Sequence, residues 1–215
     1  MPQFDISSLT GVLGNVIYVS LTLLALWGLF CTAVVWMRVG QTRFRNEGSQ
    51  NEFLTEIEQA LSRGDFNAAA SLCENDRRAM PQLALMAISQ RDLGYNKLRQ
   101  MVADRFQRDF LADLEYRLSW VHTVIKSAPM IGLLGTVIGM MGAFAKIAGS
   151  EKVQASSLAA DISLALITTA FGLAIAIPLV LCTASINVRI RKMEDLVGAG
   201  LTRFFDGLRP ALAKR

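Results

Sequence analysis

Three long runs of apolar residues alternate with polar segments along the chain. They cover residues 12–37, 127–145 and 162–188, and none of them contains a Lys, Arg, His, Asp or Glu. A helix needs about 20 apolar residues, each rising about 1.5 Å, to cross the hydrocarbon core of a bilayer. The pattern therefore predicts an all-α integral membrane protein with three transmembrane helices. The first run has no basic leader and is much longer than the apolar part of a signal peptide, so we expect it to be retained.

The distribution of basic residues predicts how the chain crosses the membrane. The net charge is +4, and residues 1–11 carry no Lys or Arg, residues 38–126 carry thirteen, residues 146–161 carry two and residues 189–215 carry seven. Segments rich in Lys and Arg stay on the cytoplasmic side. We therefore expect residues 38–126 and the tail 189–215 in the cytoplasm, with residues 1–11 and the link 146–161 outside. The basic residues form no stripe interleaved with aromatic residues, which argues against a nucleic-acid partner.

The cytoplasmic segment has apolar residues at helical spacing. One group precedes the Arg63-Gly64-Asp65 triplet and another follows it, and they are Phe53, Leu54, Ile57, Ala60 and Leu61, then Phe66, Ala69, Ala70 and Cys73. This predicts a helical hairpin that turns at the triplet and ends before Pro81. Between Lys97 and Pro129 no Gly or Pro occurs, so we expect one long helix extending from the membrane into the cytoplasm. Its apolar stripe needs a partner, which is either the hairpin or a neighbouring copy of the chain.

The second and third runs each carry a row of small residues on one helix face. Gly132, Gly135, Gly139 and Gly142 recur at i, i+3, i+7 and i+10, and the third run places Ala165, Thr169, Gly172 and Ala176 in line with Asp161. Small residues let membrane helices approach closely, so both faces are predicted to pack against other helices. Pro178 lies inside the third run, where we expect it to perturb the backbone and to require neighbours that satisfy the carbonyl it frees.

The chemistry available to this chain is limited by the absence of charge inside its spans. Intramembrane ionisable groups mark ion and proton pathways, and a threonine hydroxyl does not carry charge by titration. A proton pathway here would therefore need a carboxylate from another chain. His122 is open to two interpretations, a proton relay or an interfacial residue. The cysteines, Cys31, Cys73 and Cys182, have no metal-binding spacing and are expected to be inert; we expect no metal, cofactor or enzyme activity.

Two segments resemble a known family. The stretch from Ala128 to Met140 resembles the second-last span of the ExbB/TolQ/MotA proton-channel family, and the stretch from Ile162 to Pro178 resembles its last span. Three predicted spans with a large cytoplasmic loop after the first are similar to the ExbB/TolQ branch. The two motifs cover about a fifth of the chain, and the loop is similar only in general character.

The resemblance implies a bacterial inner-membrane homopentamer, surrounded by membrane lipid, with the N-terminus in the periplasm. Helices two and three of each subunit would line a central pore occupied by a dimer of single-span ExbD/TolR-like partners. A membrane Asp of the partner would exchange protons opposite hydroxyls that here would be Thr136 and Thr169, next to Thr168. Proton flow would then power a periplasm-spanning protein of the TonB or TolA type.

One position departs from the family pattern. ExbB-like sequences place a glutamate where this chain has Leu164, and Asp161, three residues earlier, is a candidate substitute at the pore mouth. The alternative is that Asp161 is only a residue at a helix N-terminus. Two other classes of function are alternatives to a motor subunit: a passive scaffold that assembles other membrane proteins through its small-residue faces, and a membrane enzyme.

Overall fold

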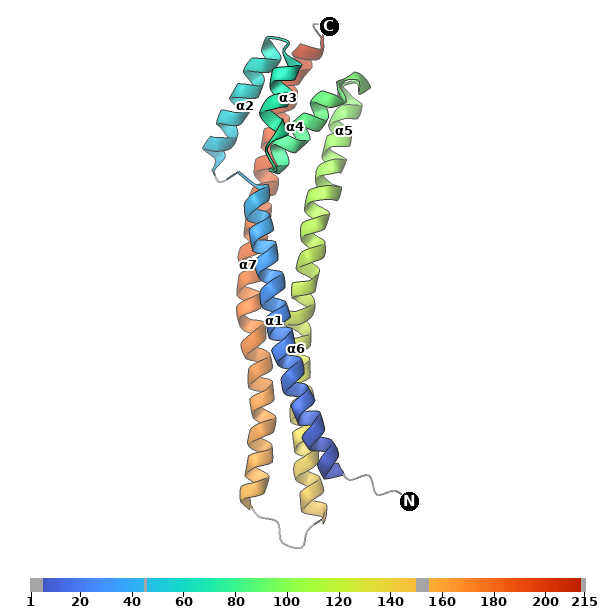
Figure 1. Ribbon diagram of the computed structural model, residues 1–215, viewed down its shortest axis with the longest axis vertical. Coiled ribbons are helices and arrows are strands. Elements are labelled where there is room, and N and C mark those ends of the chain that lie inside the picture. The colour runs from blue at the N-terminus through green and yellow to red at the C-terminus, as the bar shows by residue number, and fades with distance from the viewer. Residues whose placement is uncertain (1–5, 45, 150–154, 214–215) are drawn as a thin grey trace. The chain divides into compact units, whose positions relative to one another are not determined.

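The computed structural model describes residues 6–44, 46–149 and 155–213, and these residues form helices without any strand. The long helices are α1 (Ile6–Thr42), α6 (Ala112–Gly149) and α7 (Ala155–Ala213). The shorter ones are α2 (Glu47–Ser62), α3 (Phe66–Glu74), α4 (Ala79–Ser89) and α5 (Tyr95–Arg105). A 3-10 turn (Arg91–Leu93) precedes α5, and a π turn (Phe106–Leu111) follows it. All of them are drawn in Figure 1.

Three stretches of helix are long and apolar enough to cross a membrane. They are Leu13–Thr42, Tyr95–Ala148 and Ser156–Leu212; the second and third contain the apolar runs 127–145 and 162–188, and the first covers the run 12–37 from residue 13 onward. The predicted all-α fold class with three candidate spans is therefore confirmed. The chain divides into two compact units, which we call the span unit (residues 1–33 and 118–184) and the hairpin unit (residues 34–117 and 185–215).

The predicted hairpin is confirmed in the hairpin unit, where α2 and α3 meet at the expected turn. Gly64 has a φ of 75°, which glycine adopts without the steric cost of a side chain. Asp65 then caps α3, because its Oδ1 atom accepts a hydrogen bond of 2.9 Å from the Ala68 N–H. Leu54, Ile57 and Leu61 of α2 are buried, so the face predicted from their spacing is the one that packs.

The structure adds two details to the helices predicted for this segment. The helical structure continues past the hairpin into α4, with Pro81 in its first turn, because the N–H that proline lacks there would have no acceptor within the helix. The long helix expected from Lys97 is confirmed as the continuous helical stretch Tyr95–Ala148. It contains a π turn that the sequence did not predict, where the Ala112 N–H donates to the carbonyl of Gln107, five residues earlier. Pro129 does not end α6, which continues to Gly149.

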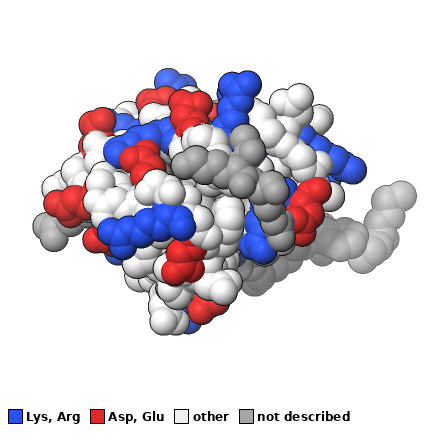
Figure 2. All heavy atoms as spheres, turned by 90° about the horizontal axis from the view of Figure 1, so that it is seen from above, with Lys and Arg blue, Asp and Glu red and all other residues white. Residues whose placement is uncertain are grey.

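The hairpin unit is held together by contacts of its short helices with α7 and with each other. Arg203 of α7 donates two hydrogen bonds to Glu58 of α2, at 2.7 and 2.8 Å, and the Gln50 side chain donates to the carbonyl of Leu196 at 2.6 Å. Helix α5 contacts α4, and Leu98 and Val102 of α5 are buried. The part of the surface seen from above in Figure 2 has Lys and Arg interspersed with Asp and Glu, which is typical of a solvated face.

The span unit is built from the apolar parts of α1, α6 and α7. Its small core consists of Val121, Val124 and Leu179, with Leu24, Cys31, Ile125 and Ile175 packed around it. Most other large apolar side chains of these helices point outward, for example Met130, which is 69% exposed. An apolar surface of this extent requires lipid or other membrane helices around it. Pro178 is exposed and lies inside α7, which continues on both sides of it.

Candidate functional site

A cluster of hydroxyl groups lies between α6 and α7 in the middle of the apolar runs. The Oγ1 atoms of Thr136 and Thr169 are 3.3 Å apart, and the Thr169 hydroxyl donates to the carbonyl oxygen of Gly132 at 2.9 Å. The Thr136 hydroxyl also lies 2.6 Å from the carbonyl oxygen of Leu133 in its own helix. The structure therefore brings together the two threonines that the sequence selected from different spans.

The hydroxyl protons of this cluster are fewer than the positions that accept them. Each threonine has one O–H donor and two acceptor lone pairs. Thr136 can donate either to Leu133 or to Thr169, and Thr169 can donate either to Gly132 or to Thr136, so several hydrogen-bond patterns fit the same heavy atoms. Both hydroxyls keep lone pairs for an additional donor such as water or a protonated carboxyl. The cluster can pass a hydrogen bond along, although it holds no charge of its own.

Thr168 is more deeply buried than the neighbouring Thr169. Its side chain is buried, at 3% exposure, whereas Thr136 and Thr169 are half-buried. The Thr168 hydroxyl lies 2.7 Å from the carbonyl oxygen of Ala165 and 3.1 Å from that of Gly132. It is therefore enclosed between the two helices, behind the Thr136–Thr169 pair, and supports the same Gly132 carbonyl.

Glycines make this close approach possible. A Cβ atom added at Gly132 would lie 2.7 Å from the carbonyl oxygen of Thr168, and one added at Gly172 would lie 2.6 Å from that of Ala128. At Gly139 the added atom would meet the Cβ of Ala165 at 2.6 Å. Gly135 faces the Thr168 side chain in the same way. The other predicted packing residues, Gly142, Ala165 and Ala176, are buried.

The carboxylate of Asp161 is paired with a residue that the sequence reading did not select. Its Oδ2 atom lies 2.6 Å from the Nζ atom of Lys146, which is on α6. Leu164, at the position where a glutamate is usual, is 49% exposed and lies outside the hydroxyl cluster. Its backbone carbonyl accepts a hydrogen bond of 3.4 Å from Tyr18 of α1, whose ring also packs edge-on against Phe171.

The first span contributes a close contact that sequence reasoning missed. A Cβ atom at Gly28 would lie 2.8 Å from Leu179 and 3.0 Å from Val124, so α1 packs tightly at this point. One turn later the buried Thr32 donates to the carbonyl of Gly28 at 2.7 Å. The spacing of Gly28 and Thr32 is a small-xxx-small pattern, and this signal was present in the first run. His122 is exposed.

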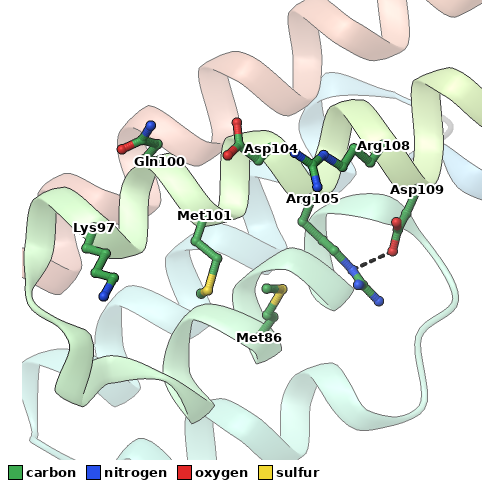
Figure 3. A pocket seen from close by; sticks show the side chains of 8 residues that line it. All are labelled: Met86, Lys97, Gln100, Met101, Asp104, Arg105, Arg108 and Asp109. Carbon is green, nitrogen blue, oxygen red and sulfur yellow. Dashed lines mark ion pairs between the residues drawn. The ribbon is translucent and has the colours of Figure 1, made fainter.

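A groove of about 400 Å³ in the hairpin unit offers less chemistry. Figure 3 shows Met101 of α5 beside Met86 of α4, with Lys97 on one side of them and Arg105, paired to Asp109, on the other. Its lining mixes cations with carboxylates and contains no nucleophile beside a base. Within the described residues, no three His, Cys, Asp or Glu side chains are grouped so that they could hold a metal ion.

The fold and the hydroxyl cluster define a helical membrane protein whose candidate spans meet through small residues and threonines. A family model for the MotA/TolQ/ExbB proton channel family matches residues 78–198, more than half of the 215-residue chain and both halves of the cluster. The chain belongs to this family.

Individual relatives agree with the family assignment. The chain is 36% identical over 94 residues to the Tol-Pal system protein TolQ of Haemophilus influenzae, an alignment that covers 44% of this chain and 41% of TolQ. It is 36% identical over 114 residues to the biopolymer transport protein ExbB of Helicobacter pylori, covering 53% of this chain and 76% of that protein. To ExbB of Pseudomonas putida it is 27% identical over 157 residues, covering 69% of this chain and 47% of the relative.

Proposed function

We propose that the chain is the ring-forming subunit of a proton-driven motor in the bacterial inner membrane. Its second and third spans line a pore, and the Thr136–Thr169 pair faces a carboxylate on a single-span partner of the ExbD or TolR type. Proton transfer to and from that carboxylate drives movement of the partner against the ring, which energises a periplasm-spanning protein of the TonB or TolA type. The ring contains several copies, with five as the expected number, and the N-terminus lies in the periplasm.

The observation that carries this proposal is the hydroxyl pair within uncharged spans. Two hydroxyls 3.3 Å apart, with spare lone pairs and a choice of donors, can stabilise a carboxyl group in either protonation state. No Lys, Arg, His, Asp or Glu lies in residues 127–145 or 162–188, so a titrating carboxylate has to come from a partner. The relatives' names support this type of system, because TolQ is named for Tol-Pal and ExbB for biopolymer transport.

The test is the variant that combines Thr136→Val with Thr169→Val. Valine keeps the branched shape of threonine while removing both hydroxyls. The protein is purified with a single-span partner of the ExbD or TolR type and reconstituted into liposomes, where a membrane potential drives proton entry. We expect the double variant to assemble a ring of unchanged mass by native mass spectrometry and to lose proton flux.

Thr22→Val is the matched control. Thr22 is exposed on α1 and donates to the carbonyl of Tyr18 at 2.8 Å, so the control removes a similar hydroxyl outside the cluster. Flux at the wild-type level in the double variant would overturn the role of the pair. Absence of proton flux from the wild-type complex, with an intact ring, would favour the passive scaffold.

A further inference from the structure

The ion pair between Lys146 and Asp161 joins α6 and α7 next to the 146–161 link. Asp161 Oδ2 is buried and lies 2.6 Å from the Lys146 ammonium, in an ion pair without the alignment of a directed hydrogen bond. The Asp161 side chain is 25% exposed and that of Lys146 is 45% exposed. The contact therefore has one shielded carboxylate oxygen and one cation that reaches it from the end of the neighbouring helix.

The pair lies close to the contact between Gly139 of α6 and Ala165 of α7. A Cβ atom added at Gly139 would touch Ala165 and would lie 3.5 Å from the backbone carbonyl oxygen of Asp161. Asp161 is eight residues before Thr169, which corresponds to about 12 Å along α7. It shares a helix face with Ala165 and Thr169, so a shift of α7 at Asp161 is transmitted directly to the hydroxyl pair.

Apart from the hydrogen bonds of Thr136, Thr168 and Thr169, the rest of this interface fixes the axial register only weakly. Gly132, Gly135 and Gly139 present short, similar surfaces, and the opposite face also consists of small side chains. Surfaces of this kind favour close approach of two helices, but they discriminate poorly between alternative positions of one helix along the axis of the other. A charge pair has a single best separation and therefore sets the register at an interface even where it adds little affinity.

We propose that Lys146 and Asp161 form a charge clasp that sets the register of α6 against α7 and so keeps Thr136 opposite Thr169. Asp161 is then a positioning residue that acts through the Gly139–Ala165 contact, and it does not carry protons in place of the glutamate absent at Leu164. The consequence for proton flux rests on the proposed function, whereas the clasp itself does not.

The register is measured by crosslinking. In a background without the native cysteines, Thr136→Cys and Thr169→Cys are introduced together, and the rate of intramolecular disulfide formation is followed under mild oxidation. We expect Lys146→Met and Asp161→Asn each to slow crosslinking by about two- to fivefold, which is the range open to a partly exposed pair. The exchanged pair, Lys146→Asp with Asp161→Lys, should crosslink faster than either single variant.

Proton flux, measured with both threonines intact, separates positioning from proton carriage. If the clasp positions the Thr136–Thr169 pair, Lys146→Met and Asp161→Asn lower the proton flux to the same extent, and the dependence of flux on pH keeps its shape. Asp161→Glu, which keeps the carboxylate, then conducts protons at the wild-type rate. If Asp161 carries protons, Asp161→Asn abolishes flux, Lys146→Met leaves it intact and the exchanged pair is inactive; this result would overturn the proposal.

Crosslinking that is unaffected by all the charge variants would also overturn the clasp. If the wild-type complex conducts no protons, the proposed function fails while the crosslinking rates still decide whether the clasp exists. Native mass spectrometry of each variant confirms that the compared rings contain the same number of subunits.

Discussion

Substitution of Gly132 by alanine tests the packing on which the hydroxyl cluster depends. The new Cβ would lie 2.7 Å from the carbonyl oxygen of Thr168 and 3.0 Å from the Cα of Thr169, whereas ordinary contacts begin near 3.4 Å. Both neighbours are backbone atoms, so they cannot rotate out of the way as a flexible side chain does. The helices must therefore separate by about 0.7 Å at this point.

The expected cost follows from this separation. A gap of about 0.5–1 Å removes a quarter to a half of the attraction of each atomic contact along the interface. Overpacking of a well-filled interior costs about 1–3 kcal/mol. The 2.9 Å hydrogen bond from Thr169 to the Gly132 carbonyl also lengthens when the helices separate. We expect Gly132→Ala to lower the free energy of unfolding by about 1–3 kcal/mol.

The measurement is unfolding of the purified protein in mixed micelles by increasing SDS, followed by far-UV circular dichroism. Gly14→Ala is the matched control, because a Cβ at Gly14 of α1 has no atom within 4 Å while the change in helix propensity is the same. A Gly132→Ala protein as stable as the Gly14→Ala protein would show that the two helices are not in backbone contact. The packing argument for the cluster would then be refuted.

Two further predictions concern the hairpin unit. Burial, and secondly the nearby Asp76 carboxylate, raises the pKa of the Cys73 thiol to about 12. At pH 8–9, about the ordinary pKa of a thiol, a maleimide should therefore label Cys73 far more slowly in the native protein than in SDS. The labelling rate is measured with the other two cysteines replaced by alanine, and equal rates in the two states would contradict the prediction. Because the pKa of Cys73 is higher in the folded than in the unfolded protein, its contribution to the free energy of unfolding is complete below the pKa of the unfolded thiol. That contribution is lost as the pH rises toward 12. Arg203→Lys keeps the charge but loses the contact of two guanidinium nitrogens with the Glu58 carboxylate, so we expect the free energy of unfolding to fall by up to about 1 kcal/mol for this partly exposed pair. In the double variant Arg203→Lys with Glu58→Gln, the second substitution should add no further loss. Strictly additive losses in SDS unfolding would show that the two residues do not interact.

Much of the architecture could be predicted because it depends on patterns within single helices. The apolar runs gave the candidate spans, and the Gly64–Asp65 turn gave the boundary between α2 and α3. The predicted end of the hairpin before Pro81 agrees with α3, which ends at Glu74, and Pro81 then lies in the first turn of α4, where proline is tolerated. The π turn has no known sequence pattern here, since Phe106–Leu111 reads as ordinary amphipathic helix.

The sequence by itself determined that the spans are uncharged, that small residues line one face of two of them, and that any titrating group comes from elsewhere. Periodicity along a helix identifies such a face, but it does not state which residue of the next helix lies at the same height. Only the tertiary structure decided that Thr136 meets Thr169, that Thr168 is enclosed behind them and that Asp161 contacts Lys146. These pairings depend on the axial register of the helices and on glycines that let two backbones come closer than side chains would allow. Both are set only when the helices pack against each other.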